Sequence, residues 1–517
     1  MNGAECLLRT LLANDVDLCL MNPGTSEMQF VAALDRVPRM RGVLGLFEGV
    51  CSGAADGYAR MTGKPAATLL HLGPGLANAL ANLHNARKAR SAVVNIVGEH
   101  STQHLGFDAP LTADIEAFAR PVSAWVRTLD RATAMGEAAS AAVTAALGPP
   151  GKVATLIVPA DFSWSEAGEP ACPAPRPSRP LPISERVRGA ACALRSGHAV
   201  GLLLSGSALQ ARGLRAADRL RHATGVRVFA DRNAARMTRG AGIPAVERIP
   251  YFPEQAQELL ARFERLILVE ARPPVSFFGY PGLRSSLAPE GCAFDVLASE
   301  DQDGAGALEW LAEELGARMP QSDTPGPPPA LPIGEPLSAV AVAMTVAALA
   351  PDGAIISDES VSCSGQIWPH LAAAASHDHL PVTGGAIGQG LPVALGAALA
   401  CPGRKVVALE ADGSGMYTPQ SLWTMARERL DVTIVILANR RYRILDIEMR
   451  RTGAGAVGPR AEEMIDLSHP QPDWIKLSEG FGVQAARAAT ADEFIREFGA
   501  AMQRPGPILI EAVLDRA

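Results

Sequence analysis

The sequence has no pair of cysteines spaced as C-x-x-C, although it contains eight cysteines. Without such pairs, neither a zinc site nor a disulfide framework is indicated, and we expect reduced, mostly buried thiols. No uninterrupted apolar run is long enough to span a bilayer, and the N-terminus lacks the basic region and cleavage site of a signal peptide. A cytoplasmic protein without membrane contact is the default expectation.

An excess of positive charge is also missing. The formal net charge is -7, which makes the chain a poor candidate for binding the phosphate backbone of nucleic acid. Hydrophobic residues make up 48% and charged residues 20% of the 517 positions, which is ordinary for a globular protein. A chain of this length suggests about three domains.

Two proline-rich stretches divide the sequence. Such composition does not build helix or sheet interiors and is typical of semi-rigid linkers. We therefore predict an N-terminal domain over 1–169, a linker over 170–182, a middle domain over 183–319, a linker over 320–336 and a C-terminal domain over 337–517.

Each predicted domain alternates short β-branched runs with amphipathic stretches, a pattern that favours an α/β fold with three doubly wound parallel sheets. The clearest expected strands are Val93–Val97, Thr155–Val158, Val200–Leu204, Leu266–Val269, Val406–Leu409, Val432–Leu437 and Ile508–Val513. The outer domains follow one plan, in which a small-residue helix leads to a strand, a glycine turn, a helix and another strand. Two similar domains suggest duplication, with a ligand held between them at the carboxyl ends of the strands.

The segment EADGSGMYTPQSLWTMARERLDVTIVILANRRY carries the sharpest pattern. Asp412 ends one predicted strand and is followed by Gly413 and Ser414 at a helix start, where backbone N–H groups suit a diphosphate. Asn439 ends the next strand, and parallel neighbouring strands would bring the two side chains together. Their oxygens are ligands that Mg²⁺ prefers. Taken singly, these residues would be a helix cap and a turn asparagine; the pair favours a metal site.

This segment resembles the motif of thiamine-diphosphate (ThDP) enzymes, namely G-D-G followed some two dozen residues later by N-N. The chain is similar to benzoylformate decarboxylase and the acetolactate synthase large subunit over most of its length, with the middle domain weakest. The resemblance implies pyrimidine-binding, middle and diphosphate-binding domains. It also implies Mg²⁺ held by Asp412, Asn439 and the carbonyl of Arg441. Ala411 and Ala438 depart from the motif, but neither replaces an expected ligand.

Glu48 lies in VLGLFEGVCSGAADGYARMTGKPA, where apolar residues precede it and small residues follow it. We expect a desolvated carboxylate, and a partly buried Glu at a helix start is the alternative. The match to the family implies that Glu48 shares a proton with N1′ of the cofactor's aminopyrimidine ring.

The resemblance implies further cofactor-binding residues. Ile387 would lie under the bend between the two cofactor rings, and the Gly385 carbonyl would accept from the 4′-amino group. Ser360 and Ser362 match a segment that borders the diphosphate, and Tyr442 follows the second half of the metal motif. A tight turn and helix-capping serines are the alternatives for these patterns.

On the substrate side, His71 follows a predicted strand and matches a histidine of benzoylformate decarboxylase that acetolactate synthases lack. It could orient the substrate carboxylate and transfer protons, unless it is a satisfied histidine at a strand end. Thr25, in NPGTSE, matches a hydroxyl residue that touches substrate. The second active-site histidine of that enzyme is missing, because Gly279 falls at its place. His100 or His104 could substitute for it, although residues of a solvated loop are the default for these two histidines.

Phe277, Phe278 and Tyr280, around that glycine, are predicted as core residues, with an apolar pocket as the alternative. DGSG does not fit the G-x-S-x-G nucleophile elbow, and no G-x-G-x-x-G supports a nicotinamide dehydrogenase.

The expected activity is decarboxylation of a 2-oxo acid with appreciable carboligation. An acetolactate synthase large subunit and a non-catalytic cofactor-binding paralogue are the alternatives. FAD is not expected, because the middle domain is short and its sequence contains no phosphate-binding glycine loop. The resemblance implies a homodimer or homotetramer in which Glu48 and Asp412 of one site come from different subunits.

Overall fold

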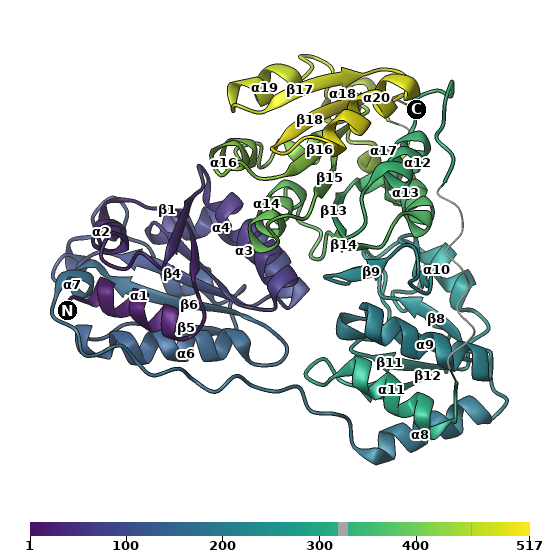
Figure 1. Ribbon diagram of the computed structural model, residues 1–517, viewed down its shortest axis with the longest axis horizontal. Helices are drawn as coiled ribbons and strands as arrows, with labels where there is room; N and C mark the ends of the chain where they lie inside the picture. Colours follow the sequence, from purple (N-terminus) through teal and green to yellow (C-terminus); the bar gives the residue numbers. More distant parts are fainter. Residues whose placement is uncertain (319–328, 456, 517) are drawn as a thin grey trace.

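The computed structural model describes residues 1–318, 329–455 and 457–516, which form three sheets flanked by helices (Figure 1). The strand orders are β2-β1-β3-β4-β6-β5, β10-β8-β7-β11-β12 and β17-β18-β16-β15-β13-β14-β9. Among the described strands, every ladder is parallel except that between β14 and β9. The expected α/β class with three parallel sheets is confirmed.

The first sheet occupies the left of Figure 1 and is covered on both faces. Its strands are β1 (Leu18–Asn22), β2 (Arg41–Leu44), β3 (Ala66–Leu70), β4 (Val93–Glu99), β5 (Trp125–Thr128) and β6 (Val153–Pro159). Its helices are α1 (Gly3–Ala13), α2 (Met28–Leu34), α3 (Glu48–Thr62), α4 (Leu72–Ala89), α5 (Ile115–Ala119), α6 (Met135–Leu147) and α7 (Ala160–Trp164). The 3₁₀ turns are η1 (Thr25–Glu27), η2 (Leu105–Phe107) and η3 (Ala132–Ala134).

The second sheet lies at the lower right of Figure 1. Its strands are β7 (Val200–Leu204), β8 (Arg227–Ala230), β10 (Glu247–Arg248), β11 (Arg265–Val269) and β12 (Ala293–Ala298). Its helices are α8 (Ser184–Arg195), η4 (Gly206–Leu209), α9 (Ala211–Thr224), α10 (Pro253–Leu260) and α11 (Gly304–Glu314).

The third sheet, at the upper right, takes one strand from the middle of the chain. Its strands are β9 (Met237–Arg239), β13 (Ala354–Glu359), β14 (His377–Pro381), β15 (Val406–Ala411), β16 (Val432–Ala438), β17 (Gln484–Ala488) and β18 (Ile508–Val513). Its helices begin with α12 (Ala339–Leu349), η5 (Val361–Cys363), α13 (Ser364–His370), η6 (Leu371–Ala373) and α14 (Gly390–Ala400). They continue with α15 (Asp412–Gly415), α16 (Ser421–Arg427), α17 (Arg443–Arg451), α18 (Pro459–Ile465), α19 (Trp474–Gly480) and α20 (Ala491–Met502).

One hydrophobic core runs from the first sheet into the third through α3 and α14, which lie side by side in Figure 1. The two helices approach so closely that only glycine fits at the contact. A Cβ atom at Gly57 would lie 2.2 Å from the Val393 carbonyl oxygen, and one at Gly396 would lie 1.9 Å from the Ala54 carbonyl oxygen. This contact fixes the Glu48 helix against the helix that follows the Gly385 loop.

Each of the seven strands expected from the sequence is present. The stretch 170–182 contains no helix or strand, whereas the predicted linker 320–336 lies partly outside the described residues. All eight cysteines are free, and four of them are buried: Cys6, Cys19, Cys51 and Cys363. No described helix combines the length and apolar character needed to cross a membrane.

Candidate active site

The residues predicted in the N-terminal part come from the carboxyl ends of three neighbouring parallel strands, β2, β1 and β3. Thr25 follows β1, Glu48 follows β2 and His71 follows β3 directly. Because parallel strands end at one edge of the sheet, the three loops meet there.

Glu48 is the first residue of α3, and its side chain is almost buried, with the residue 8% exposed. Its Oε2 accepts a hydrogen bond from the Asn78 side chain at 3.0 Å. A Cβ atom at Gly75 would lie 3.1 Å from Glu48 Oε1 and 3.4 Å from the Cβ of His71. Glu48 and His71 therefore flank the same glycine, so the structure brings these two predicted residues together.

His71 has a partner that the sequence analysis missed. Its Nδ1 lies 2.8 Å from Oε2 of Glu27, which also accepts from the backbone N–H of Gly24 at 2.7 Å. Glu27 is buried, and this desolvation raises the pKa of its carboxyl group against the lowering effect of His71. Gly24 is required here, because a Cβ atom would lie 2.2 Å from the imidazole ring. The motif NPGTSE ends in Glu27, but the sequence alone pointed only to Thr25 within it.

The loop after β4 adjoins the same pair. A Cβ atom at Gly98 would fall on Oε1 of Glu27, so the end of β4 closes over the buried carboxylate. His100 follows two residues later and is half-buried, whereas His104 and Thr25 are exposed. The rings of His100 and His104 lie 5.3 Å apart. Of the two candidate substitutes, His100 is therefore the closer along the chain to Gly98, the residue that contacts Glu27.

The residues predicted in the C-terminal part also gather at one sheet edge. They follow four neighbouring parallel strands, β16, β15, β13 and β14. The residues after these strands are, in the same order, Asn439 with Arg441 and Tyr442; Asp412 with Gly413 and Ser414; Ser360 with Ser362; and Gly385 with Ile387.

Asp412 is a buried carboxylate without a cationic partner among the described side chains. It accepts only backbone N–H groups, from Gly413 at 2.9 Å and from Arg440 at 2.5 Å. Burial raises the pKa of Asp412 to about 6. Asn439 follows the neighbouring strand and is equally buried. A buried carboxylate that lacks a counter-charge, beside an amide oxygen, fits a divalent cation.

The turn after Asp412 differs from the expectation in one respect. The helix that begins there, α15, is a single turn, and the longer helix starts only at Ser421. A helix dipole is therefore small, and backbone N–H groups of the turn remain as the donors for a diphosphate. Tyr442 packs directly on Gly413, where a Cβ atom would lie 2.4 Å from the phenol ring. Arg441 is held by a bidentate ion pair with Glu462.

Ser360 is less available than expected. Its hydroxyl donates to Asp358 Oδ1 at 2.5 Å, and its backbone N–H donates to the same atom at 3.0 Å. Ser362, in η5, is half-buried, and within the described part of the chain no carboxylate accepts from its hydroxyl. Of the two serines, Ser362 has the freer hydroxyl.

The loop that carries Gly385 and Ile387 is held from both sides. Asn85 of α4 donates to the Ala386 carbonyl oxygen at 2.8 Å and accepts from the Ala386 N–H at 3.2 Å. The Glu359 carboxylate, at the end of β13, accepts hydrogen bonds from the backbone N–H groups of Gly388 and Gly390. Gly385 has φ +80°, which only glycine adopts easily. The loop is therefore fixed in shape before any ligand binds.

The segment around Gly279 reaches this loop. A Cβ atom at Gly385 would lie 2.4 Å from the Phe277 ring, so Phe277 borders the predicted cofactor loop. Phe277 and Phe278 are partly exposed, so the expectation that they are core residues is wrong. Tyr280 is buried, as expected, and donates to Glu448 at 3.0 Å.

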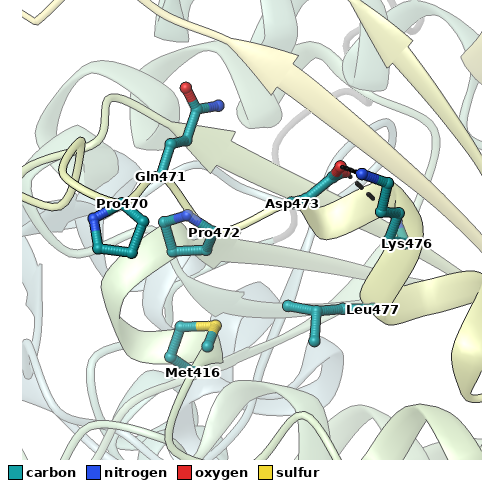
Figure 2. Close-up of a pocket in the computed structure, with 7 residues that line it drawn as sticks. All are labelled: Met416, Pro470, Gln471, Pro472, Asp473, Lys476 and Leu477. Carbon is teal, nitrogen blue, oxygen red and sulfur yellow. Dashed lines mark hydrogen bonds and ion pairs between the residues drawn. The ribbon is translucent and has the colours of Figure 1, made fainter.

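A pocket of about 430 Å³ lies beside Met416, close in the chain to the Asp412 turn (Figure 2). The figure shows Pro470, Gln471 and Pro472 along one side and the Asp473–Lys476 ion pair, 3.2 Å long, along the other. Its lining contains none of the predicted site residues among those the structure describes. We therefore do not identify it with the predicted cofactor site.

Two sheet edges, one carrying a buried glutamate and the other a buried aspartate, are the features of a thiamine-diphosphate enzyme. The N-terminal TPP binding domain of thiamine pyrophosphate enzymes matches residues 1–119, and their C-terminal TPP binding domain matches residues 361–512. The chain belongs to this family.

Individual relatives agree with the family assignment. The chain is 50% identical to "Putative acetolactate synthase large subunit IlvX" of Mycobacterium tuberculosis, over 99% of both proteins. It is 29% identical to benzoylformate decarboxylase of Pseudomonas aeruginosa, over 95% of this chain and 94% of the relative. Among solved structures, the thiamine diphosphate-dependent 4-hydroxybenzoylformate decarboxylase of Rhodococcus jostii RHA1 superposes with a TM-score of 0.87 at 25% identity, over 100% of both chains.

Proposed function

We propose that the protein is a ThDP- and Mg²⁺-dependent decarboxylase of 2-oxo acids that also joins the resulting unit to an acceptor aldehyde. The single observation that carries this proposal is the buried Glu27–His71 pair beside Glu48. When bound, ThDP supplies the electron sink that lets the bond between a carbonyl carbon and its carboxylate break.

The cofactor would be held by both sheet edges. Asp412, Asn439 and the Arg441 carbonyl would bind Mg²⁺, and backbone N–H groups near Gly413 would bind the diphosphate. Tyr442, Ser414 and Ser362 border the diphosphate. These roles rest on the family resemblance together with the buried, cation-free surroundings of Asp412.

Glu48 holds a proton at N1′ of the aminopyrimidine, and Asn78 keeps its carboxylate in place. The Gly385 carbonyl would accept a hydrogen bond from the cofactor, and Ile387 would pack against it. The Asn85 and Glu359 hydrogen bonds hold this loop in its shape, so that little ordering entropy is lost when the cofactor binds.

His71 binds the substrate carboxylate and transfers protons through Nε2. An ionised Glu27 only accepts hydrogen bonds, so it favours the tautomer with the proton on Nδ1 and leaves Nε2 as the free atom. Thr25 borders the substrate from the loop after β1. No histidine occupies position 279, so the acid that would release an aldehyde is missing from that segment, which favours capture of the product by an acceptor.

An acetolactate synthase large subunit is the second candidate, because the relative of that name is 50% identical over nearly the whole chain. The middle sheet argues against the FAD that acetolactate synthases carry. At the carboxyl end of β11, the buried Glu270 accepts from the N–H groups of Ser207 at 3.2 Å and Gly304 at 3.0 Å, and from Arg179 at 2.8 Å. An internal carboxylate thus takes the donors that a nucleotide phosphate would need.

We further propose a homodimer or homotetramer. Among the described residues, no hydrogen bond or ion pair links the Glu48 loop to the Asp412 turn of the same chain. Large apolar side chains are exposed close to both in the chain: Leu46 before Glu48, and Met416 and Tyr417 after the Asp412 turn, 38% to 54% exposed. A second copy would cover these faces and complete each site with the other subunit's residues.

The test is a CO₂-release screen of pyruvate, branched 2-oxo acids and benzoylformate, each with and without an acceptor aldehyde, followed by product analysis. Release of CO₂ with aldehyde or 2-hydroxy ketone as product supports the proposal. Acetolactate as the dominant product from pyruvate would favour the second candidate. No turnover of any 2-oxo acid would favour a cofactor-binding protein without catalysis.

A further inference from the structure

Two guanidinium groups lie over the ring of Trp368, which is on α13. Cζ of Arg239 lies 3.6 Å and Cζ of Arg248 lies 3.9 Å from the centroid of its ring. Arg239 comes from β9, the middle-chain strand that joins the third sheet, and Arg248 comes from β10 of the second sheet. The cluster therefore lies where these two sheets meet.

Positive charge exceeds negative charge in this cluster. Arg232 is the third arginine: its Cζ lies 5.0 Å from the Tyr251 ring, and its charge acts on Arg248. Asp358 is the carboxylate that acts on all three arginines, and it is already engaged by Ser360 and by His379 at 3.2 Å. Burial lowers the pKa of both Arg239 and Arg248 to about 9. Desolvation of these cations is not compensated by the residues around them.

The neighbouring charged groups do not correct this imbalance. Asp378 is paired with Arg236 at 2.7 Å and with Arg404 at 2.8 Å. His377 and His379 are buried, and desolvation lowers the pKa of each below its ordinary value, so both are neutral at pH 7. The excess of positive charge therefore stays within the cluster.

Several buried polar atoms of the cluster lack a partner in the described part of the chain. They include Nη1 of Arg239, a residue that is 7% exposed, Nε2 of His377 and Nδ1 of His379. Oδ2 of Asp358 and Nε2 of His379 lie 3.2 Å apart and are partners of each other. Buried polar groups are nearly always hydrogen-bonded, so a concentration of unpartnered atoms indicates a bound species.

The charge decides which species fits. Water would satisfy hydrogen bonds but would leave the arginine charges uncompensated. A metal cation would be repelled by the guanidinium groups, and within the described residues no set of three or more His, Cys, Asp and Glu side chains forms a metal site. Guanidinium groups match oxyanions in both charge and geometry.

We propose that Arg232, Arg239 and Arg248 bind a small oxyanion, a phosphate or carboxylate group, beside Trp368. Arg232, Arg248 and Trp368 are only partly buried, so the anion reaches the cluster from solvent. Arg248 is oriented by its bond to the Ser364 hydroxyl at 3.1 Å, and Arg239 by its bond to the Trp368 carbonyl oxygen at 2.8 Å. Within the described residues, neither guanidinium is held by a carboxylate, so both keep donors for a ligand.

The experiment uses the full-length protein saturated with ThDP and Mg²⁺, so that the diphosphate site is filled. Equilibrium dialysis against labelled inorganic phosphate, at constant ionic strength set with chloride, measures the bound anion. We expect about one phosphate per chain, and at least tenfold weaker binding in Arg239→Gln and Arg248→Gln. The matched control is Arg227→Gln, because Arg227 also lies over an aromatic ring, Phe229 at 5.1 Å, but is ion-paired with Glu247. Its phosphate binding should be unchanged.

Acetate in place of phosphate distinguishes a carboxylate site from a phosphate site, and tighter binding of either anion supports the proposal. Trp368→Phe should remove an anion-dependent change in fluorescence while dialysis still detects the anion. If Arg239→Gln does not fold, phosphate binding by the Arg248→Gln variant tests the proposal, because Arg248 is partly exposed. Absence of saturable binding of both anions, or binding that survives Arg248→Gln at wild-type strength, overturns the proposal.

Discussion

The Glu27–His71 pair makes a prediction that a merely structural histidine would not. Glu27→Gln preserves the size of the side chain, and its amide oxygen can still accept from the Gly24 N–H. Because Oε2 of Glu27 meets both the Gly24 N–H and Nδ1 of His71, an amide oxygen in its place accepts from both groups but lacks the negative charge that strengthens the bond to the imidazole. A hydrogen bond to a charged group contributes about 1.5–3 kcal/mol, so we expect kcat/KM for CO₂ release to fall about 10- to 100-fold.

The assay compares wild type, Glu27→Gln and His71→Ala under saturating ThDP and Mg²⁺. His71→Ala should lose at least as much activity as Glu27→Gln, and the double variant should lose no more than His71→Ala alone, since Glu27 acts through the histidine. ThDP affinity should be unchanged in all three. A Glu27→Gln protein with the wild-type rate and the wild-type pH profile would refute the reasoning, as would an additive loss in the double variant.

Three further predictions follow from the site and the core. Asp412→Ala should abolish ThDP binding measured by intrinsic fluorescence, and EDTA should do the same to wild type; equal affinity in EDTA would contradict the metal assignment. Glu48→Gln should keep the circular dichroism of wild type but lose most activity, and an unchanged exchange rate of the cofactor's C2 proton would rule out its role. Burial lowers the pKa of His377 from 6.5 to about 3, so the unfolded chain binds a proton that the folded chain lacks between these values. The contribution of His377 to the free energy of unfolding is therefore fully present above pH 6.5. It falls by about 1.4 kcal/mol per pH unit as the pH drops toward 3. His377→Gln should flatten the acid side of the Tm–pH curve, and an equally steep curve would show that this histidine is not the cause.

The parts of the site that follow strands were predictable from the sequence. Asp412 and Asn439 each end a continuous apolar run, and such runs form neighbouring parallel strands whose ends meet. Glu48 is proposed from the apolar residues before it and the small residues after it, together with the match to the family, and its catalytic role stays a prediction. The sequence also indicates that α3 is a helix of small residues, but its close contact with α14 was not predicted.

Contacts between distant segments could not be predicted. Glu27 and His71 are 44 positions apart on separate loops, and no periodicity links them. Strand β9 has three residues and joins the third sheet from the middle of the chain, so its sequence carries too little pattern to reveal its partner. The arginine cluster at Trp368 depends on that strand pairing, so it could not be predicted from the sequence. Phe277 was assigned to the core because aromatic residues usually are, whereas it borders the Gly385 loop.

The most direct measurement of the central claim is CO₂ release by protein stripped of cofactor and then reconstituted. With benzoylformate or a branched 2-oxo acid as substrate, we predict activity only when ThDP and Mg²⁺ are both added, and none with either alone. CO₂ release that needs neither component, or no release from any 2-oxo acid after full reconstitution, would contradict the account.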